Sequence, residues 1–178
     1  MNVAIVTPLY PPDVADTATY VKELATRLSK TYTVTILTYG YMPERIANVT
    51  IVRVNKRSPL LVRIVQFSFA LFSVARKNDV LYIINGPSVE LPLALASFVI
   101  HTPFVFHIRD TAAHAYTRTH MLRRAIETLV QKRARRVVTT TPKTKPEVLP
   151  FVSVSPEESS AYEASWHTHM AEVTQTLS

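Results

Sequence analysis

The first 28 residues constrain the fold of this chain more than any other stretch. Val3–Val6 is a continuous apolar run, which predicts a strand buried on both faces of a parallel sheet. Prolines at positions 8, 11 and 12 end that strand and prevent a hairpin. A helix is predicted next, with Asp16 placed to cap it and with an apolar face made of Val21, Leu24, Ala25 and Leu28. This order of strand, loop and helix predicts a ligand-binding loop, because ligands of open α/β sheets bind where the strands end.

The same alternation of strands and helices continues along the chain. Further strands are expected at 32–39, 49–54, 79–84, 104–108 and 136–140, and further helices at 58–75, 90–100 and 121–135. We expect three side chains of the helix at 58–75 to face inward: Val65, Phe69 and Phe72. The expected inward set of the helix at 121–135 is Leu122, Ile126 and Leu129. These lengths predict an α/β fold with a doubly wound, mostly parallel, Rossmann-like sheet.

A further helix is predicted at the carboxyl end of the chain. Ser155-Pro-Glu-Glu158 has the pattern of a capping box, with a proline at the first helical position. An amphipathic face follows at spacings of four and three: Tyr162, Trp166, Met170, Val173 and Leu177. The predicted organisation is one domain over 1–141, a Lys- and Pro-rich connector over 142–155, and a helix over 156–178 that packs on the same domain and buries Trp166.

Several classes of site are excluded by residues that the chain lacks. It has no cysteine, which excludes cysteine-ligated metals and fits a reducing compartment, and the start of the chain shows no signal-peptide pattern. A cytoplasmic location is therefore expected. The only glycines are Gly40 and Gly86, so the chain has no glycine-rich phosphate loop and no nucleophile elbow. The histidines lack metal-site spacing, so we expect neither a metal nor a cofactor.

The formal net charge of +7 points to an anionic partner. The basic residues are dispersed and lack interleaved stacking aromatics, which argues against nucleic acid. Basic residues flank the apolar segment at 58–75, which contains Arg63 and Gln66 and is shorter than the roughly 20 residues that span a bilayer. Two interpretations stay open: a helix packed on the sheet, or such a helix whose outer aromatics and basic flanks also rest on an anionic membrane through residues 56–77. The second makes the protein peripheral on the inner membrane face.

Five segments follow one another in a recognisable order: 5–14, 19–25, 79–87, 103–110 and 133–140. Together they resemble the N-terminal domain of GT-B-fold glycosyltransferases of family 4. The resemblance implies that this domain holds the sugar acceptor, while a second Rossmann-like domain holds the nucleotide-sugar. Residues 162–170 resemble the family's closing helix, which crosses back onto the N-terminal domain.

Two departures from the family pattern bear on activity. Ala15 and Asp16 stand where the family usually has a Gly-Gly pair near the donor phosphates and the acceptor. Alanine restricts the backbone there, and an aspartate facing the cleft would repel a diphosphate. No segment of the chain resembles the donor-binding domain, so we expect a partner chain to supply it.

The resemblance also implies a set of site residues. The family's common His-Asp pair after the fifth strand reads Arg109-Asp110 here, which implies Asp110 as the carboxylate that acts on the acceptor hydroxyl. The implied residues for binding the acceptor or its phosphate are Arg109, Tyr10, Ala15, Asp16, Thr17 and Gly86. His107 is expected to be a strand side chain that faces a helix.

Two functions remain open at this point. The first is the acceptor side of a glycosyltransferase, which transfers sugar to a sugar or lipid-linked acceptor only with a donor-binding partner. The second is a non-catalytic binding or scaffolding domain that descends from such an enzyme, which the loss of the Gly-Gly pair favours.

Overall fold

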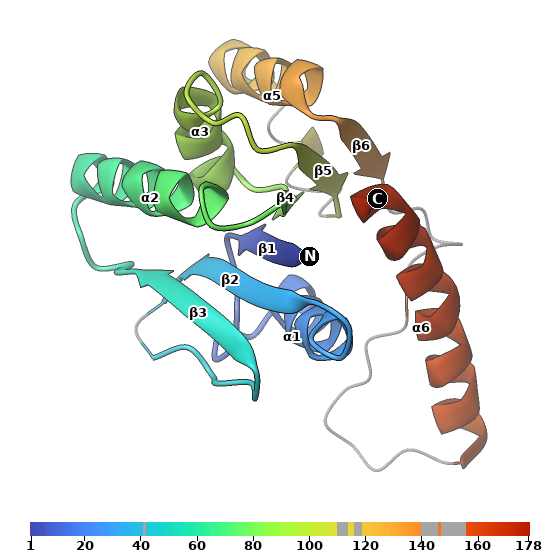
Figure 1. Cartoon of the computed structure of the whole chain (residues 1–178). Coiled ribbons are helices and arrows are strands. Elements are labelled where there is room, and N and C mark those ends of the chain that lie inside the picture. Colours follow the sequence, from blue (N-terminus) through green and yellow to red (C-terminus); the bar gives the residue numbers. More distant parts are fainter. Residues whose placement is uncertain (41, 110–113, 116–118, 140–145, 147–155) are drawn as a thin grey trace.

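The centre of the molecule is a six-stranded sheet in which all neighbouring strands are parallel (Figure 1). The computed structural model describes residues 1–40, 42–109, 114–115, 119–139, 146 and 156–178. The strands are β1 (Asn2–Thr7), β2 (Thr33–Tyr39), β3 (Val49–Val54), β4 (Val80–Ile84), β5 (Phe104–Ile108) and β6 (Arg136–Thr139). They lie in the order β3-β2-β1-β4-β5-β6, so the strand order reverses between β1 and β4. The strands predicted from the sequence are confirmed.

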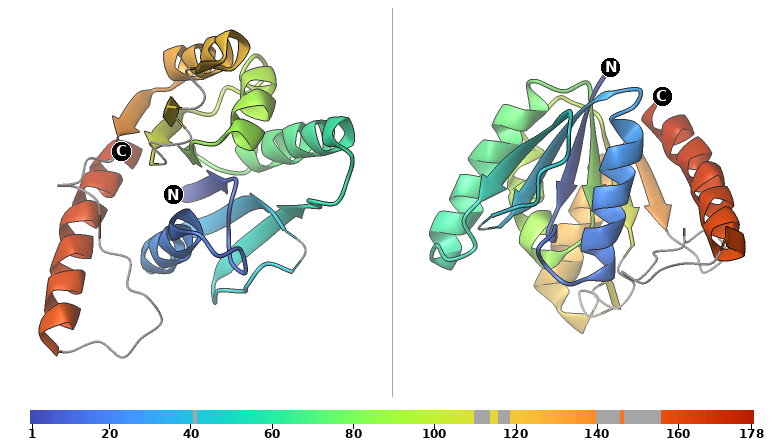
Figure 2. Two further views of the ribbon diagram at one scale, coloured as in Figure 1. Left: turned by 180° about the vertical axis from the view of Figure 1, so that it is seen from behind. Right: turned by 90° about the horizontal axis from the view of Figure 1, so that it is seen from below.

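Helices cover both faces of the sheet. They are α1 (Asp16–Leu28), α2 (Leu60–Ala75), α3 (Pro87–Ala96), α5 (Met121–Arg133) and α6 (Pro156–Leu177). Figure 2 shows α1 and α6 on one face and α2, α3 and α5 on the other. The predicted α/β, doubly wound, Rossmann-like fold with a C-terminal helix is therefore confirmed.

Each face of the sheet has its own apolar core, because alternate residues of a strand point to opposite faces. Val3 and Ile5 of β1 belong to the core beneath α1 and α6, whereas Ala4 and Val6 belong to the core beneath α2, α3 and α5. All five residues of β4 are buried, as expected of a strand with helices on both sides.

The predicted inward face of α2 is wrong in part. Val65 and Phe69 are 52% and 71% exposed, and the helix instead buries Phe67, Leu71, Val74 and Ala75. Since the helix is apolar on nearly every side, its sequence pattern does not mark the buried face. In α5, Leu122 is exposed, while Ile126 and Leu129 pack against the core as predicted.

The start of α1 also differs from the expectation. Ala15, and not Asp16, occupies the N-cap position, with the extended backbone typical of a cap but with no side-chain oxygen to offer. Asp16 lies in the first turn of the helix, where its negative charge stabilises the helix dipole.

The C-terminal helix α6 packs against α1. Trp166 is completely buried and stacks on Tyr20 of α1, with the ring centroids 5.6 Å apart. Arg27 of α1 donates two hydrogen bonds to Glu163 of α6, at 3.0 and 2.7 Å. Near the end of the chain, Arg135 donates to the carbonyl of Ser178. The predicted burial of Trp166 is confirmed; the predicted capping residue Ser155 lies outside the described residues.

Among the helices of the described residues, none combines the length and the apolar character needed to cross a bilayer.

Candidate functional site

The carboxyl ends of β1 and β4 meet where the strand order reverses, the position at which open α/β sheets bind ligands. Pro8 follows β1 and Gly86 follows β4, and the two residues are in close contact. A Cβ atom at Gly86 would lie 2.8 Å from Cγ of Pro8, so only glycine fits at this position. Gly86 precedes α3 and donates its backbone N–H to Oε1 of Glu90, at 3.1 Å.

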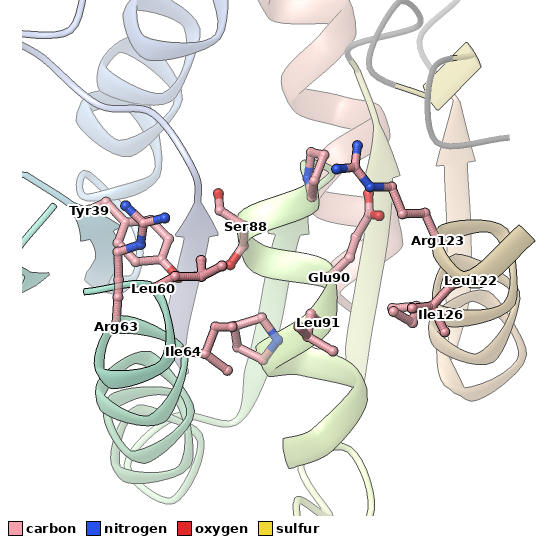
Figure 3. Close-up of a pocket in the computed structure, with 12 residues that line it drawn as sticks. Tyr39, Leu60, Arg63, Ile64, Ser88, Glu90, Leu91, Leu122, Arg123 and Ile126 are labelled. Carbon is pink, nitrogen blue, oxygen red and sulfur yellow. The ribbon is translucent and has the colours of Figure 1, made fainter. Parts of the chain in front are cut away.

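Two adjoining pockets open along this edge of the sheet, with volumes of about 360 and 500 Å³. They share the lining residues Tyr39, Arg63, Pro87 and Ser88, so we treat them as one cleft. The larger pocket is bounded by Pro8, Thr17, Lys56 and Gly86 among others. The smaller one, shown in Figure 3, lies between α2, α3 and α5 and reaches Glu90 and Arg123.

Cationic side chains lie along the whole length of the cleft. Lys56 enters it after β3 and pairs with Asp13, and Arg63 comes from the first turn of α2. Arg63 donates to the carbonyl of Lys56 at 3.2 Å and lies 5.7 Å from the ring of Tyr39, whose hydroxyl donates to the carbonyl of Ser88. Arg123 is at the opposite end, on α5. This row of cations suits a ligand that carries a phosphate or carboxylate.

Glu90 is the carboxyl group of the cleft. It is only 3% exposed, and burial, with a further contribution from the charge of Glu127, raises its pKa to about 7. The Gly86 N–H, His114 and Arg123 act in the opposite direction. Figure 3 shows the Arg123 guanidinium beside the Glu90 carboxyl group. A carboxyl with a pKa near neutrality can accept a proton from a ligand hydroxyl and release it again.

The carboxylate of Glu127, whose charge acts on Glu90, is held in place by two partners. Nδ1 of His114 contacts Oε1 of Glu127, and Nε2 of Gln131 donates to the same oxygen at 3.2 Å. Glu127 is 3% exposed, so its charge acts on Glu90 through a poorly screened medium.

Arg109 directly follows β5, as predicted, but its side chain makes contacts within the protein. Its backbone N–H donates to Oδ1 of Asn85, and its Nη2 donates to Oδ2 of Asp16 at 3.0 Å. The guanidinium lies 3.8 Å from the ring centroid of Tyr20, on the α1 face of the sheet. The Asp16 carboxylate is thus neutralised by Arg109, which reduces the repulsion that the sequence predicts for a diphosphate.

A cluster of aromatic rings and imidazoles surrounds Tyr20 on this face. The Tyr20 hydroxyl is 2.8 Å from Nε2 of His169, and the Tyr82 hydroxyl is 2.8 Å from Nδ1 of His107. Burial, helped by the Arg109 charge, lowers the pKa of His169 to about 4 and that of His107 to about 3. Both imidazoles are therefore neutral at pH 7. The expectation that His107 is a strand side chain facing a helix is confirmed, since its ring contacts Tyr20 of α1 and His169 of α6.

The remaining predicted site residues differ in their positions. Thr17 and Gly86 line the cleft. Tyr10 is buried, its hydroxyl donates to the carbonyl of Glu44, and burial raises its pKa to about 12. Ala15 occupies the N-cap of α1. Asp110 lies outside the described residues, so its role stays a prediction.

Five charged or aromatic residues that line the cleft were not predicted as site residues: Tyr39, Lys56, Arg63, Glu90 and Arg123. One signal for Glu90 is present in the sequence. It is the only acidic residue between Asp79 and Asp110, in a stretch rich in apolar side chains. A lone carboxylate in such a setting indicates a buried and perturbed group.

In the part of the chain that the structure describes, no three His, Asp or Glu side chains are grouped so that they could bind a metal ion.

Comparison with known proteins agrees with the family resemblance. A model of the glycosyl transferase 4-like domain matches residues 17–158. The chain belongs to the glycosyl transferase 4-like domain family. The match begins at α1, so β1 and the proline-containing loop precede it. No curated protein sequence matches the chain.

Two solved structures are similar to this glycosyl transferase 4-like chain. One is the C-terminal domain of the coenzyme A biosynthesis bifunctional protein CoaBC, with 12% identity and a TM-score of 0.46 over 97% of this chain and 96% of that chain. The other is the DNA/pantothenate metabolism flavoprotein from Streptococcus pneumoniae, with 11% identity and a TM-score of 0.46 over 100% of this chain and 99% of that chain.

Proposed function

We propose that this domain forms the acceptor-binding side of a glycosyltransferase. The cleft holds an acceptor, and a nucleotide-sugar is presented by a second domain outside residues 1–178, on a partner chain. Family membership supports glycosyl transfer as the activity. The observation that carries the proposal is the cleft at the switch point of the sheet, with the buried Glu90 carboxyl between cationic side chains.

The lining of the cleft suits an acceptor with a hydroxyl group and a negative charge. Arg63 and Lys56 lie toward one end of the cleft and Arg123 lies toward the other. At either end, an anionic group of the acceptor binds through charge-assisted hydrogen bonds. The exposed side chain of Leu60 and the partly buried Ile64 continue the lining away from Glu90. We therefore include lipid-linked acceptors in the proposed class.

The proposed reaction uses Glu90 as the proton acceptor. The acceptor oxygen forms a bond to the anomeric carbon of the donor sugar while the bond from that carbon to the nucleotide phosphate breaks. The hydroxyl proton passes to Glu90, and the nucleotide diphosphate leaves with the bonding electrons. A carboxyl group with a pKa of about 7 is matched to this task near neutral pH.

The test is a transfer assay with the domain, candidate donor-binding partners and UDP- or GDP-sugars. We expect transfer in one pairing and a loss of about 10²-fold or more in kcat with Glu90→Gln, which keeps an acceptor for the Gly86 N–H. Arg123→Ala should raise KM for the acceptor. Arg124→Ala is the matched control, since Arg124 is an exposed neighbour on the same helix. Absence of transfer in every pairing would overturn the proposal.

The predicted role of Asp110 can be separated from that of Glu90 in the same assay. If Asp110→Asn abolishes transfer while Glu90→Gln leaves kcat unchanged, Asp110 is the base and Glu90 only stabilises the start of α3. We expect the larger loss from Glu90→Gln.

The second candidate is a non-catalytic binding domain. The observation that favours it is that Ala15 and Asp16 stand in place of the family's Gly-Gly pair, with Ala15 at the N-cap of α1. Such a domain would bind the acceptor, with affinity reduced by Arg123→Ala, yet give no transfer with any donor-binding partner. Calorimetric titration of the acceptor alongside the transfer assay distinguishes the two functions.

A further inference from the structure

Helices α2 and α3 present a large apolar surface to solvent. It consists of Leu60, Leu61, Val62, Val65 and Phe69 from α2, and Leu95, Phe98 and Val99 from the end of α3 and the residues after it. Each of these side chains is between 46% and 76% exposed. The two helices lie side by side in Figures 1 and 2, so the residues form one α2–α3 surface. Contiguous apolar surfaces on soluble domains mark contacts with other molecules.

The α2–α3 surface is hollowed by an apolar groove of about 380 Å³, bounded by Val65 and Phe69 on α2 and by Leu95 and Val99 on the other side. Ile64 lines both this groove and the cleft that contains Glu90. The surface therefore extends up to the candidate functional site.

The charged residues on α2 and directly before and after it are basic; the first acidic residue beyond them is Asp79, and Lys56 pairs with Asp13. Between Lys56 and Asn78 the chain carries five basic residues and no acidic one. Arg76 lies 4.5 Å from the Phe72 ring, and Arg133 of α5 lies 4.1 Å from the Phe98 ring. The single acidic residue of α3, Glu90, is buried and turned toward the cleft. An apolar surface with a cationic rim results.

We propose that the α2–α3 surface binds an anionic lipid bilayer. Its apolar side chains enter the boundary between headgroups and acyl chains, as in interfacial amphipathic helices. Arg76, Lys77 and Arg133 at its rim contact the lipid phosphates. A symmetric dimer through this surface would bring two cationic rims together, whereas an anionic membrane has the complementary charge. The helix lies on the membrane, since α2 has only 16 residues.

Flotation of the full chain with phosphatidylcholine vesicles, with and without phosphatidylglycerol, tests the proposal. We expect the protein to float with the phosphatidylglycerol vesicles and to stay unbound with phosphatidylcholine alone. The double variant Leu61→Ser/Phe69→Ser should lower binding about tenfold or more, because two side chains no longer enter the apolar layer. Arg76→Glu/Lys77→Glu should lower it about tenfold, and added salt should lower it for the wild type.

Matched controls lie elsewhere on the molecule. Met42→Ser removes an exposed apolar side chain after β2, and Lys30→Glu reverses an exposed charge after α1; both should bind as the wild type does. Circular dichroism verifies that each variant is folded. Failure to float, or flotation unaffected by Leu61→Ser/Phe69→Ser, would overturn the proposal. So would a dimer in light scattering that this double variant dissociates, combined with absence of flotation. None of these results depends on sugar transfer, so the proposed function is tested separately.

Discussion

The two faces of the sheet are covered by helices of opposite character. On one face, α1 directs its apolar side chains inward and carries charges outward, and Trp166 of α6 closes the core over Tyr20. On the other face, α2 is apolar inside and outside, and Phe69 points to solvent while Phe67 is buried. The apolar side chains of the first face are therefore covered by other residues of the chain. Those on the outer side of α2 are exposed, and we infer that they contact another molecule.

The largest expected effect compares two aromatic side chains. Trp166→Ala should lower the free energy of unfolding by about 3–5 kcal/mol, because a fully buried ring is lost. Phe69→Ala should change it by about 0.5 kcal/mol or less, since the ring is 71% exposed. Urea unfolding measures both. Similar losses would contradict the contrast between the faces.

The next largest effect is expected at the edge of the sheet where the carboxyl ends of the strands lie. Gly86→Ala should destabilise the protein by about 1–3 kcal/mol, because the new Cβ overlaps the Pro8 ring. Gly40→Ala is the matched control, since the nearest heavy atom to a Cβ there is Cδ of Pro43 at 4.0 Å. Thermal unfolding should show a lower Tm for Gly86→Ala alone.

The free energy of unfolding should fall in acid because of His169, which lies on the face of the sheet that α1 and α6 cover. Because the pKa of His169 is lowered to about 4, the unfolded chain binds a proton more readily between pH 6.5 and 4, and stability falls as the pH drops through this window. His169→Gln should flatten the stability profile measured by urea unfolding at several pH values. His101→Gln, at an exposed position, should leave it unchanged.

The contribution of Glu90, in the cleft, to the free energy of unfolding should change with pH in the opposite direction. The pKa of Glu90 is raised to about 7, so the folded protein holds this proton more tightly than the unfolded chain does. The resulting stabilisation is present below about pH 4.5 and is lost as the pH rises through 7. Glu90→Gln should therefore be more stable than the wild type at pH 8 and lose this advantage in acid. Equal pH profiles for the two proteins would show that Glu90 is not perturbed.

The smallest effect is expected on the solvent side of the α1–α6 contact. Glu163→Gln weakens the ion pair with Arg27, but the Glu163 side chain is 60% exposed. Exposed ion pairs contribute about 0–1 kcal/mol, so thermal unfolding should change little and the difference should vanish at high salt. A loss as large as that of Trp166→Ala would mean that charge, and not ring burial, holds α6 in place.

Much of the fold could be predicted from the sequence because its strands are short runs of apolar residues with clear ends. The strands, the class of the sheet and the buried face of α6 all followed from periodicity, since alternation and helical spacing are local properties. The buried face of α2 did not. When nearly every side chain of a helix is apolar, the sequence pattern does not indicate which side of the helix is buried. Only the packing of the neighbouring elements decides which side chains are covered.

The candidate site shows the same division. The sequence determined that Gly86 and Arg109 follow strands of a parallel sheet, and so lie at its ligand-binding edge. Only the tertiary structure decided that Arg109 turns away to Asp16 and Tyr20, while Arg63, Glu90 and Arg123, from three different helices, line one cleft. Burial and proximity to Glu127 perturb the Glu90 pKa, and both arise from residues distant in the chain. Local spacing fixes where a strand ends, but the environment of a charge is set by how the helices pack.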